Sequence, residues 1–564
     1  MVERPLVRSK TVGVLAIGSR TVPRRKRSGQ LIPPGSARAW ISARRGDLLF
    51  AVISAAFAWA SLTYPFGRDQ GLYYYVGREW ALRGAIPYRD VFDHKTPGLY
   101  FVHAICVKVF GETFWGIRLA DLLAVLGVGW ISGAIVANLR TMPKPPLRGL
   151  GCFIASVTFF GCLDFKATSE GEIWMALCCL ASLVLTLPHP KTGLPPSRYR
   201  LFASGAMGAA GLLMKPLAAV LLLVVFLPLV WRGRRSLAPV ARQLLAVLAG
   251  ALAVLAPVTL YFLAHGALRA AYELVVEANS LYVREGSLIK KPVDLLIQTK
   301  VLFDWYSPFS YVLSALLAVA TLRALVRKDS QSRQSLLLGL GLSLSAWATI
   351  CIQGKFFQGH WGVMIVGVPL LVLSLVADAI KLSPERARRW IAPGASFTLV
   401  LLFLASERAV EHRDVNLAAL RWVMGKATRD EFTAHFHEFF VGGPVADNEA
   451  CGAWLREHTN ETDFVAVRGF QPQVYASARR RYPGRLFWTV FALGPAGATH
   501  REKWLEEDRH ALAANPPRFA ATFSFVHGTV EATDWWVARG YTVRTVIGDF
   551  TIVERTAETA TQPW

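Results

Sequence analysis

Between residues 48 and 406 the chain alternates between about twelve apolar stretches and short polar connections, most stretches approaching the roughly 20 residues with which a helix crosses a bilayer. The composition agrees, because 53% hydrophobic and 18% charged residues, with a mean hydropathy of +0.35, are too apolar for a soluble protein of 564 residues. Such stretches stop near residue 407. The sequence therefore predicts a mainly α-helical, polytopic membrane protein in which residues 407–564 form a small soluble domain.

The basic residues predict which parts of the chain face the cytoplasm. The net charge is +23 at pH 7, and the lysines and arginines lie mostly in short connections between apolar stretches, where they favour retention in the cytoplasm. This pattern indicates a membrane bilayer, and no nucleic acid, as the partner of the basic residues. Residues 1–47, with eleven Lys and Arg, are expected to form a basic cytoplasmic tail. Five further connections are assigned to the cytoplasm: 140–148, 189–200, 232–242, 323–333 and 381–390.

Two apolar runs separate each pair of successive basic connections, so the transmembrane region, 48–406, is predicted to contain helical hairpins whose tips point outward. Runs 98–111 and 114–138 break the alternation: either the first is re-entrant or a further span is hidden. An odd total of about 11 to 13 spans leaves the N-terminus inside and residues 407–564 outside, in a multi-pass protein of a bacterial-type inner cell membrane. The expected outer segments are 64–97, 164–171, 214–216, 265–300 and 353–360.

The first outer loop, 64–97, combines an acidic residue with an amphipathic helix. After Asp69, Leu72, Val76 and Trp80 recur at i, i+4 and i+8, which predicts a short helix lying in the headgroup plane. Transporters are expected to place their essential polar groups near the midplane of broken helices, whereas the polar residues here gather in the outer segments. Their distribution therefore favours chemistry at the outer surface.

Asp69, the tyrosine-rich helix through Gly84, then Pro87 and His94-Lys95-Thr96-Pro97, follow the order found in C-superfamily (GT-C) glycosyltransferases. The chain resembles those members that are related to protein O-mannosyltransferases and the lipid A aminoarabinose transferase. The resemblance implies a GT-C type helical bundle with a small C-terminal extracytoplasmic α/β domain. Three further motifs extend it over most of the membrane region: Thr168-Ser169-Glu170, Met214-Lys215-Pro216 and the run from Gln353 to His360.

Two positions depart from the family pattern. Gln70 follows Asp69 where the family usually has Glu, which argues against a metal or second-carboxylate role there and leaves the base intact. Thr96 precedes Pro97 in the lysine motif. Gln70, His94 and Glu170 are candidates for binding or orienting a substrate, although an acid that starts a helix is an equally ordinary explanation of Glu170.

By resemblance, such an enzyme transfers a sugar with inversion from a polyprenyl-phosphate donor to an acceptor hydroxyl of a glycan, lipid or protein on the extracytoplasmic face. The acceptor needs a base, and Asp69 is the candidate, with a solvated helix cap as the alternative. Lys95 is the leading candidate for the donor phosphate, with an interfacial anchor as the alternative. Lys215, Lys355 and His360 are possible helpers. No cofactor and no metal site are expected, because the outer acidic residues show no ligand spacing.

The second large outer loop, 265–300, is long enough to cover a substrate and is interpreted as a lid or acceptor-side wall. The C-terminal domain is predicted to be a small α/β structure that docks an acceptor or acts as a structural lid. It lacks a glycine-rich phosphate loop. A transporter or flippase of lipid-linked sugars and an O-antigen-ligase-like enzyme are the alternative functions. In the C-terminal domain, helices are predicted near 448–458, 501–514 and 531–539, and strands at 463–467, 519–523 and within 541–555.

Overall fold

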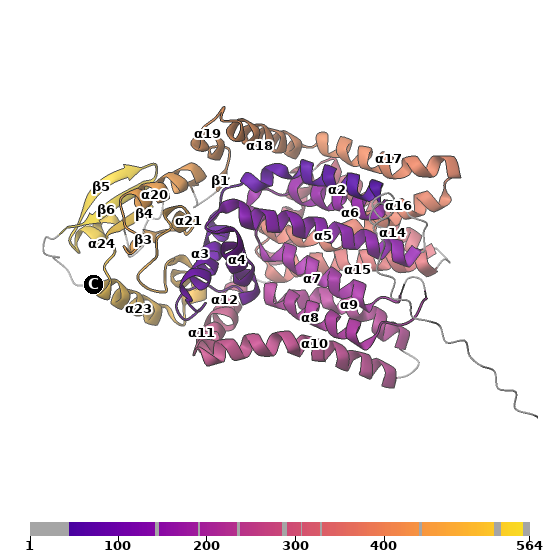
Figure 1. Cartoon of the computed structure of the whole chain (residues 1–564), viewed down its shortest axis with the longest axis horizontal. Coiled ribbons are helices and arrows are strands. Elements are labelled where there is room, and N and C mark those ends of the chain that lie inside the picture. The colour runs from indigo at the N-terminus through magenta and orange to yellow at the C-terminus, as the bar shows by residue number, and fades with distance from the viewer. Residues whose placement is uncertain are drawn as a thin grey trace, which may run out of the picture. The chain divides into compact units, whose positions relative to one another are not determined.

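The computed structural model of the chain describes residues 44–140, 146–189, 192–233, 237–284, 290–305, 307–326, 330–438, 443–523 and 532–556 (Figure 1). The chain divides into two compact units, residues 1–45 and residues 46–564. Only Arg44 and Arg45 of the first unit are described, so the basic tail predicted for residues 1–47 lies almost wholly outside the described residues.

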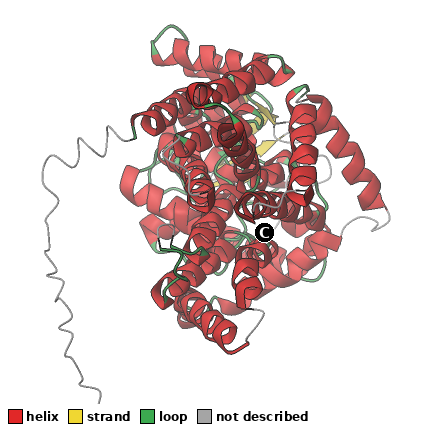
Figure 2. Cartoon of the chain, turned by 90° about the vertical axis from the view of Figure 1, so that its right-hand side faces the viewer, coloured by secondary structure: helices red, strands yellow, loops and turns green. Residues whose placement is uncertain are grey.

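Helices build the region predicted to span the membrane, and Figure 2 shows them in red with the yellow strands behind them. Short 3-10 or π-helical segments interrupt the α-helices. The α-helices are α2 (Arg45–Phe57), α3 (Arg68–Arg83), α4 (Pro97–Phe110), α5 (Phe114–Arg140), α6 (Leu147–Ser156), α7 (Gly171–Thr186), α8 (Arg198–Met214), α9 (Ala218–Gly233), α10 (Leu237–Ala264), α11 (Leu268–Tyr272), α12 (Asn279–Arg284), α13 (Lys290–Trp305), α14 (Phe309–Val326), α15 (Ser330–Gln353), α16 (Val368–Leu382), α17 (Glu385–Leu404) and α18 (Glu407–Val423). The interrupting segments are η1 (Trp59–Thr63), η2 (Val157–Gly161), η3 (Phe165–Ala167), η4 (Glu273–Ala278) and η5 (Gln358–Val366).

Within the described part of the chain, three helices are long and apolar enough to cross a membrane singly, at Phe114–Arg140, Ala238–Ala264 and Gln331–Gln353. Two bent pairs of helices would raise this number to five, and five shorter apolar helices accompany them. The predicted total of about 11 to 13 spans therefore stays a prediction. One of the shorter helices, Leu147–Gly161, consists of α6 followed directly by the π-helical η2.

The run predicted at 98–111 forms α4, which has 14 residues. At 1.5 Å per residue such a helix is about 21 Å long, shorter than the roughly 30 Å hydrocarbon core. Its length fits the re-entrant alternative. The next run forms α5 with 27 residues, long enough to cross the bilayer.

Helices occupy much of the described part of the second outer loop, 265–300, and its role as a lid or acceptor-side wall stays a prediction. It contains α11, η4, α12 and the start of α13. The helical repeat is visible in Ala267, Leu274 and Ala278, which are fully buried at spacings of seven and four. The sequence analysis relied on the polar side chains between these residues and did not predict the buried helical face. The adjoining apolar run, predicted at 301–322, is likewise divided between α13 and α14.

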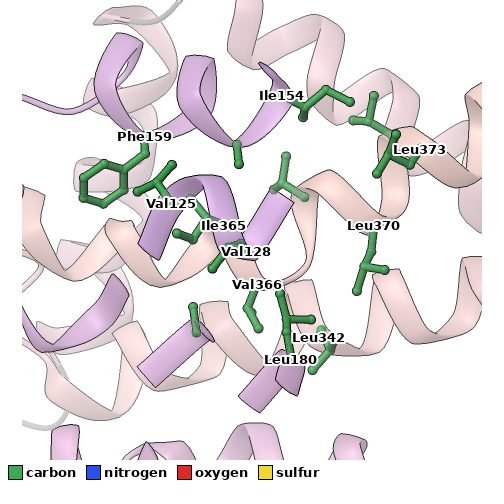
Figure 3. Close-up of a cluster of buried hydrophobic side chains, with 14 of the residues drawn as sticks. Val125, Val128, Ile154, Phe159, Leu180, Leu342, Ile365, Val366, Leu370 and Leu373 are labelled. Carbon is green, nitrogen blue, oxygen red and sulfur yellow. The ribbon is translucent and has the colours of Figure 1, made fainter. Parts of the chain in front are cut away.

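The largest hydrophobic core joins helices from both halves of the membrane region (Figure 3). Val125 and Val128 of α5 lie among side chains from η5, α15 and α16, including Ile365, Leu342 and Leu370. Glycines bring α5 and α6 close together, because a Cβ on Gly129 would lie 2.3 Å from the carbonyl oxygen of Gly151. This core sets the positions from which the outer segments extend.

The C-terminal residues form the predicted small α/β domain. Its four-stranded sheet has the order β3-β4-β6-β5, in which β3 and β4 are parallel and the other pairs antiparallel. The predicted strands at 463–467, 519–523 and 541–555 and the helices near 448–458 and 501–514 all appear within a few residues. The strands are β3 (Val465–Arg468), β4 (Phe519–Phe523), β5 (Tyr541–Ile547) and β6 (Phe550–Arg555), and the helices are α19 (Arg429–Thr433), α20 (Val445–Glu457), α21 (Val474–Ala478), α22 (Val490–Leu493), α23 (Arg501–Ala514) and α24 (Thr533–Val537). A two-stranded pair, β1 (His437–Glu438) with β2 (Gly443–Pro444), precedes α20.

The C-terminal domain shares a hydrophobic core with the first outer loop. Tyr75 of α3 and Phe92 lie in one cluster with Phe487 and Trp504 of the C-terminal domain. The Tyr75 and Phe487 rings are 4.2 Å apart between centroids, and those of Phe92 and Trp504 are 4.9 Å apart. The domain therefore holds α3 and the residues that follow it in place.

Candidate active site

Helix α3 begins at the predicted acidic residue. Its first turn is closed by Gln70, whose side-chain oxygen accepts a hydrogen bond from the Gly67 N–H at 2.8 Å. The Gln70 amide also donates to the Lys166 carbonyl at 2.5 Å, and the side chain is only 1% exposed. These contacts make Gln70 a cap that ties the start of α3 to the segment before α7.

Asp69 stands in the same first turn, and its side chain is 42% exposed. Its Oδ1 accepts a hydrogen bond from Arg68 Nε at 3.1 Å. Burial by itself would raise the pKa of Asp69, but the charges of Arg68 and Lys95 and the Arg68 hydrogen bond outweigh it and lower the pKa below its ordinary value. The carboxylate is therefore ionised at neutral pH and able to accept a proton.

The backbone of Lys95 is fixed by tyrosines. Its carbonyl accepts a hydrogen bond from the Tyr88 hydroxyl at 2.8 Å, and its N–H donates to the Tyr100 oxygen at 3.0 Å. The Tyr100 hydroxyl in turn donates to Asp93 Oδ2 at 2.6 Å. Burial opposes the charged form of Lys95, but attraction from Asp69, Tyr282 and Asp93 outweighs it and raises its pKa, so the ammonium group keeps its charge.

His94, the neighbour of Lys95, is enclosed by aromatic rings from distant segments. Its ring stacks on Phe491 with a centroid separation of 4.0 Å and an interplanar angle of 5°. Trp488 lies 6.1 Å and Tyr282 5.9 Å away between centroids. Burial, then the charge of Lys95, lower the pKa of His94. A neutral, stacked imidazole is better suited to packing among these rings than to binding the phosphate as a second cation.

The motif before α7 brings further carboxylates to the site. Glu170 accepts a hydrogen bond from the Tyr73 hydroxyl at 3.4 Å. Burial, then repulsion by Asp69 and Glu172, raise the pKa of Glu170 well above its ordinary value. Glu170 and Asp69 therefore interact electrostatically, although they are a hundred residues apart in the chain. Glu170 therefore holds a proton more readily than Asp69.

Lys215 forms an ion pair with Glu172, a residue that the sequence analysis did not select. The approach depends on two close backbone contacts. The Thr96 hydroxyl donates to the Met214 carbonyl at 2.9 Å, and a Cβ on Gly98 would lie 2.6 Å from the Leu213 carbonyl oxygen. The start of α4 therefore lies directly beside the end of α8, which brings Lys95 and Lys215 to the same region.

Lys355 and His360 reach the site from the segment after α15. The Lys355 ammonium lies 4.2 Å from the ring centroid of Tyr282, the tyrosine that also lies near His94. The charges of Lys95 and Lys215 both act on His360. Gly359, its neighbour, is near enough to Glu170 that an added Cβ would lie 3.8 Å from Glu170 Cγ.

The fold thus gathers all eight residues selected from the sequence, contributed by segments from Asp69 to His360. Gln70 and His94 differ from the other six in role, because Gln70 caps α3 and the His94 ring stacks on Phe491. Sequence analysis missed Tyr73, Glu172 and Tyr282. Tyr73 and Glu172 each lie within four residues of a selected residue, but no pattern in the sequence marks them as partners.

The arrangement combines an ionised carboxylate with cations and a protonatable second acid. A carboxylate beside an alcohol can act as a general base, and lysines can stabilise a leaving phosphate. Among the described residues, no group of three His, Cys, Asp or Glu is placed to hold a metal ion. The absence of a metal and a cofactor, expected from the sequence, stays a prediction.

Comparison with known proteins shows the fold, and part of the chain matches one family. Residues 94–261 match the family of dolichyl-phosphate-mannose-protein mannosyltransferases. The crystal structure of ArnT from Cupriavidus metallidurans in the apo state is similar over 93% of this chain and 99% of that chain, with a TM-score of 0.52 and 14% identity. The oligosaccharyltransferase AglB from Archaeoglobus fulgidus aligns over 92% of this chain and 75% of that chain, with a TM-score of 0.39 and 12% identity. No curated protein matches the chain.

Proposed function

Residues 94–261 match the family of dolichyl-phosphate-mannose-protein mannosyltransferases and the fold is similar to that of ArnT, so we propose that the chain is a GT-C type membrane glycosyltransferase that transfers a sugar from a polyprenyl-phosphate donor to an acceptor hydroxyl. The name of the matching family includes dolichyl-phosphate-mannose, which supports a donor of this class. We propose the extracytoplasmic face as the side of transfer, because the basic connections are expected on the opposite side.

The observation that carries the proposal is the attraction between the Asp69 carboxylate and the Lys95 ammonium group. The two side chains interact electrostatically, each favouring the ionised form of the other. One is a base for the acceptor and the other a cation for the leaving group, so both halves of the reaction meet at one place.

The proposed step balances as an inverting displacement. Asp69 takes the proton of the acceptor hydroxyl while the acceptor oxygen forms a bond to the anomeric carbon. The bond between that carbon and the phosphate oxygen breaks, and the polyprenyl phosphate leaves with the electron pair. Lys95 stabilises the charge that develops on the phosphate. Lys215 contributes less, because its charge is already paired with Glu172.

The test uses the full-length protein in lipid nanodiscs with short-chain polyprenyl-phosphate sugars and an envelope extract as the source of acceptor. The expected result is release of polyprenyl phosphate together with a glycosylated product, both detected by mass spectrometry. A protein that translocates these donors across liposomes without cleaving them would contradict the proposal and favour a flippase.

A further inference from the structure

A cavity of about 320 Å³ lies on the other side of α3 from the candidate active site. One wall comes from Tyr74 of α3 and from the α4–α5 connection at Glu112 to Phe114, and the other from α19, α20 and α21. Its volume is within the roughly 300–1,000 Å³ of small-molecule sites. Tyr74 follows Asp69 by five residues, which places it about 140° around the helix and about 7.5 Å along it.

The floor of the cavity consists of small residues. Ala450 and Ala453 of α20 face Ala476 and Ser477 of α21. The two helices pack closely here, because a Cβ on Gly452 would lie 2.5 Å from the Ser477 Cβ. The cavity exists because short side chains line it. The two helices around it are closely packed.

The charged groups in the walls are held in fixed positions. Arg429 forms two hydrogen bonds to Glu449, at 2.8 and 2.9 Å, and its guanidinium lies 4.7 Å from the Trp422 ring centroid. Glu112 is bound by the buried Arg78. Arg479 donates to the Glu112 carbonyl at 3.1 Å. Groups that are held in this way can bind a ligand without first being ordered.

Other polar groups in the cavity have no protein partner. Tyr74 is only 4% exposed, and within the described residues its hydroxyl forms no hydrogen bond. Asp430 and Arg456 line the same cavity and form no ion pair with any residue that the structure describes. These groups line the cavity and do not bond to one another, so a ligand in the cavity can form hydrogen bonds with them.

We propose that this cavity binds an uncharged sugar unit of a glycan acceptor, an inference that rests on the proposed transferase function. The lining balances three arginines with three carboxylates, so it offers no net charge to attract an ionic ligand: Arg429, Arg456, Arg479, Glu112, Asp430 and Glu449. Donors and acceptors that alternate at short range suit vicinal hydroxyl groups. Phe114, which is only partly buried, adds aromatic surface for the apolar face of a sugar ring.

The position of the cavity gives it a definite role. Its occupant is separated from Asp69 by the thickness of α3, about 10 Å. A sugar bound there cannot be the one that reacts, and it anchors a longer glycan whose reactive end reaches Asp69. Binding energy from such a remote unit orients the acceptor, so its loss is expected to raise KM for the acceptor more than it lowers kcat.

The test uses the full chain in nanodiscs and the neutral glycans released from the envelope of cells that lack this protein. Ala453→Phe fills the cavity, and Ala513→Phe places the same side chain on the exposed face of α23 as a matched control. Without donor, Ala453→Phe is expected to bind these glycans at least about tenfold more weakly than wild type, whereas the control binds as wild type does. With donor, the acceptor KM is expected to rise by a similar factor.

Donor binding, measured separately, shows whether the Ala453→Phe protein is folded, and the exposed Asp430→Asn variant gives a second test with a smaller expected loss. Equal glycan binding by the Ala453→Phe and Ala513→Phe proteins would overturn the inference, as would wild-type protein that binds an envelope lipid or protein fraction but no neutral glycan. Failure of the proposed function looks different: glycans bind at the cavity, but no polyprenyl phosphate is released.

Discussion

At the scale of single residues, the site depends on charges that hold one another in the ionised form. Asp69 lies where burial alone would favour its neutral form, and Lys95 likewise. The charges of Arg68 and Lys95 reverse the effect of burial on the pKa of Asp69, and attraction from Asp69 does so for Lys95. For Glu170, burial and repulsion by Asp69 and Glu172 outweigh the attraction of Lys95 and Lys215, so its pKa is raised. The three residues therefore have different protonation behaviour although all lie in one region.

Asp69→Asn is expected to abolish most of the transfer. The amide keeps the shape of the side chain but cannot act as a base at neutral pH, and general-base catalysis contributes about 100- to 10,000-fold. Sugar transfer should fall by at least about 100-fold while donor binding persists. The two are measured separately on purified protein in nanodiscs. Transfer within a few-fold of wild type would remove Asp69 as the base.

Lys95→Ala is expected to weaken donor use much more than Lys95→Arg, because the arginine keeps the charge and part of the reach. The measurement is KM and kcat for the polyprenyl-phosphate sugar with each variant. If both variants behaved like wild type, Lys95 would be an interfacial anchor, and the phosphate role would pass to Lys215 or Lys355.

The acidic limb of the pH profile is expected to move in the Lys95→Ala variant. Transfer needs ionised Asp69, so the rate falls as pH drops through the pKa of that carboxyl. Removal of Lys95 withdraws one of the charges that lower this pKa, so the fall should begin at a higher pH than in wild type. Residual transfer is measured from pH 8 down to about pH 3, below the ordinary aspartate pKa of about 3.9, with Lys95→Arg as the control that keeps the wild-type profile. An unchanged limb would mean that Lys95 does not act on Asp69.

At the scale of elements, α3 is the connection between the membrane region and the C-terminal domain. One of its faces carries Asp69 and Tyr73 toward the site. Another is pressed against the C-terminal domain, where a Cβ on Gly71 would lie 2.3 Å from the Gln473 Cα. Arg78 continues this contact by donating to the Arg479 carbonyl at 2.7 Å. The position of the candidate base therefore depends on a domain that is distant in the sequence.

Gly71→Ala is expected to lower both stability and transfer, because backbone atoms on the facing segment would have to move. Overpacking of this kind costs about 1–3 kcal/mol. Gly394→Ala in α17 is the matched control, since no atom lies within 4 Å of its added Cβ, and it should leave stability unchanged or raise it by up to about 1 kcal/mol. Thermal unfolding and transfer are measured for both. Equal unfolding temperatures would show that α3 adjusts freely.

At the scale of the whole molecule, the proposed chemistry requires that the first outer loop and the C-terminal domain lie on one side of the membrane. The shared core of Tyr75, Phe92, Phe487 and Trp504 requires the same. The second outer segment joins them, because His500 lies 2.9 Å from Glu277 and Lys503 lies 3.0 Å from Glu273. These contacts place three sequence-distant regions on one face.

Topology reporters fused after residues 90, 280 and 430 are expected to report an extracytoplasmic location, and fusions at 144 and 235 a cytoplasmic one. The reason is the arginine and lysine content of the connections near 144 and 235. Reporter enzymes active on only one side of the membrane provide the measurement. A cytoplasmic signal from the fusion at 430 would contradict the parity of the predicted spans.

The sequence by itself determined the class of the protein and the positions of most candidate residues. Apolar runs identified the helical bundle because burial in a bilayer demands local, continuous hydrophobicity. Alternating patterns located the strands and the longer helices of the C-terminal domain, since strand and helix periods are properties of neighbouring residues. Motif order selected Asp69, Lys95, Glu170 and Lys215 for the same reason: each motif is written in consecutive residues.

Only the tertiary structure decided how these residues are paired. The ion pair of Lys215 with Glu172 and the enclosure of His94 by Tyr282 and Phe491 join segments far apart in the chain. Gln70 was selected as a substrate candidate; its side chain caps α3 through the Gly67 N–H and also donates to the distant Lys166 carbonyl. The helices α11 and α12 were not predicted, because the buried face of the segment at 265–300 is matched to a partner surface. Such contacts depend on the residues of both segments. The residue pattern of one segment does not show which other segment packs against it.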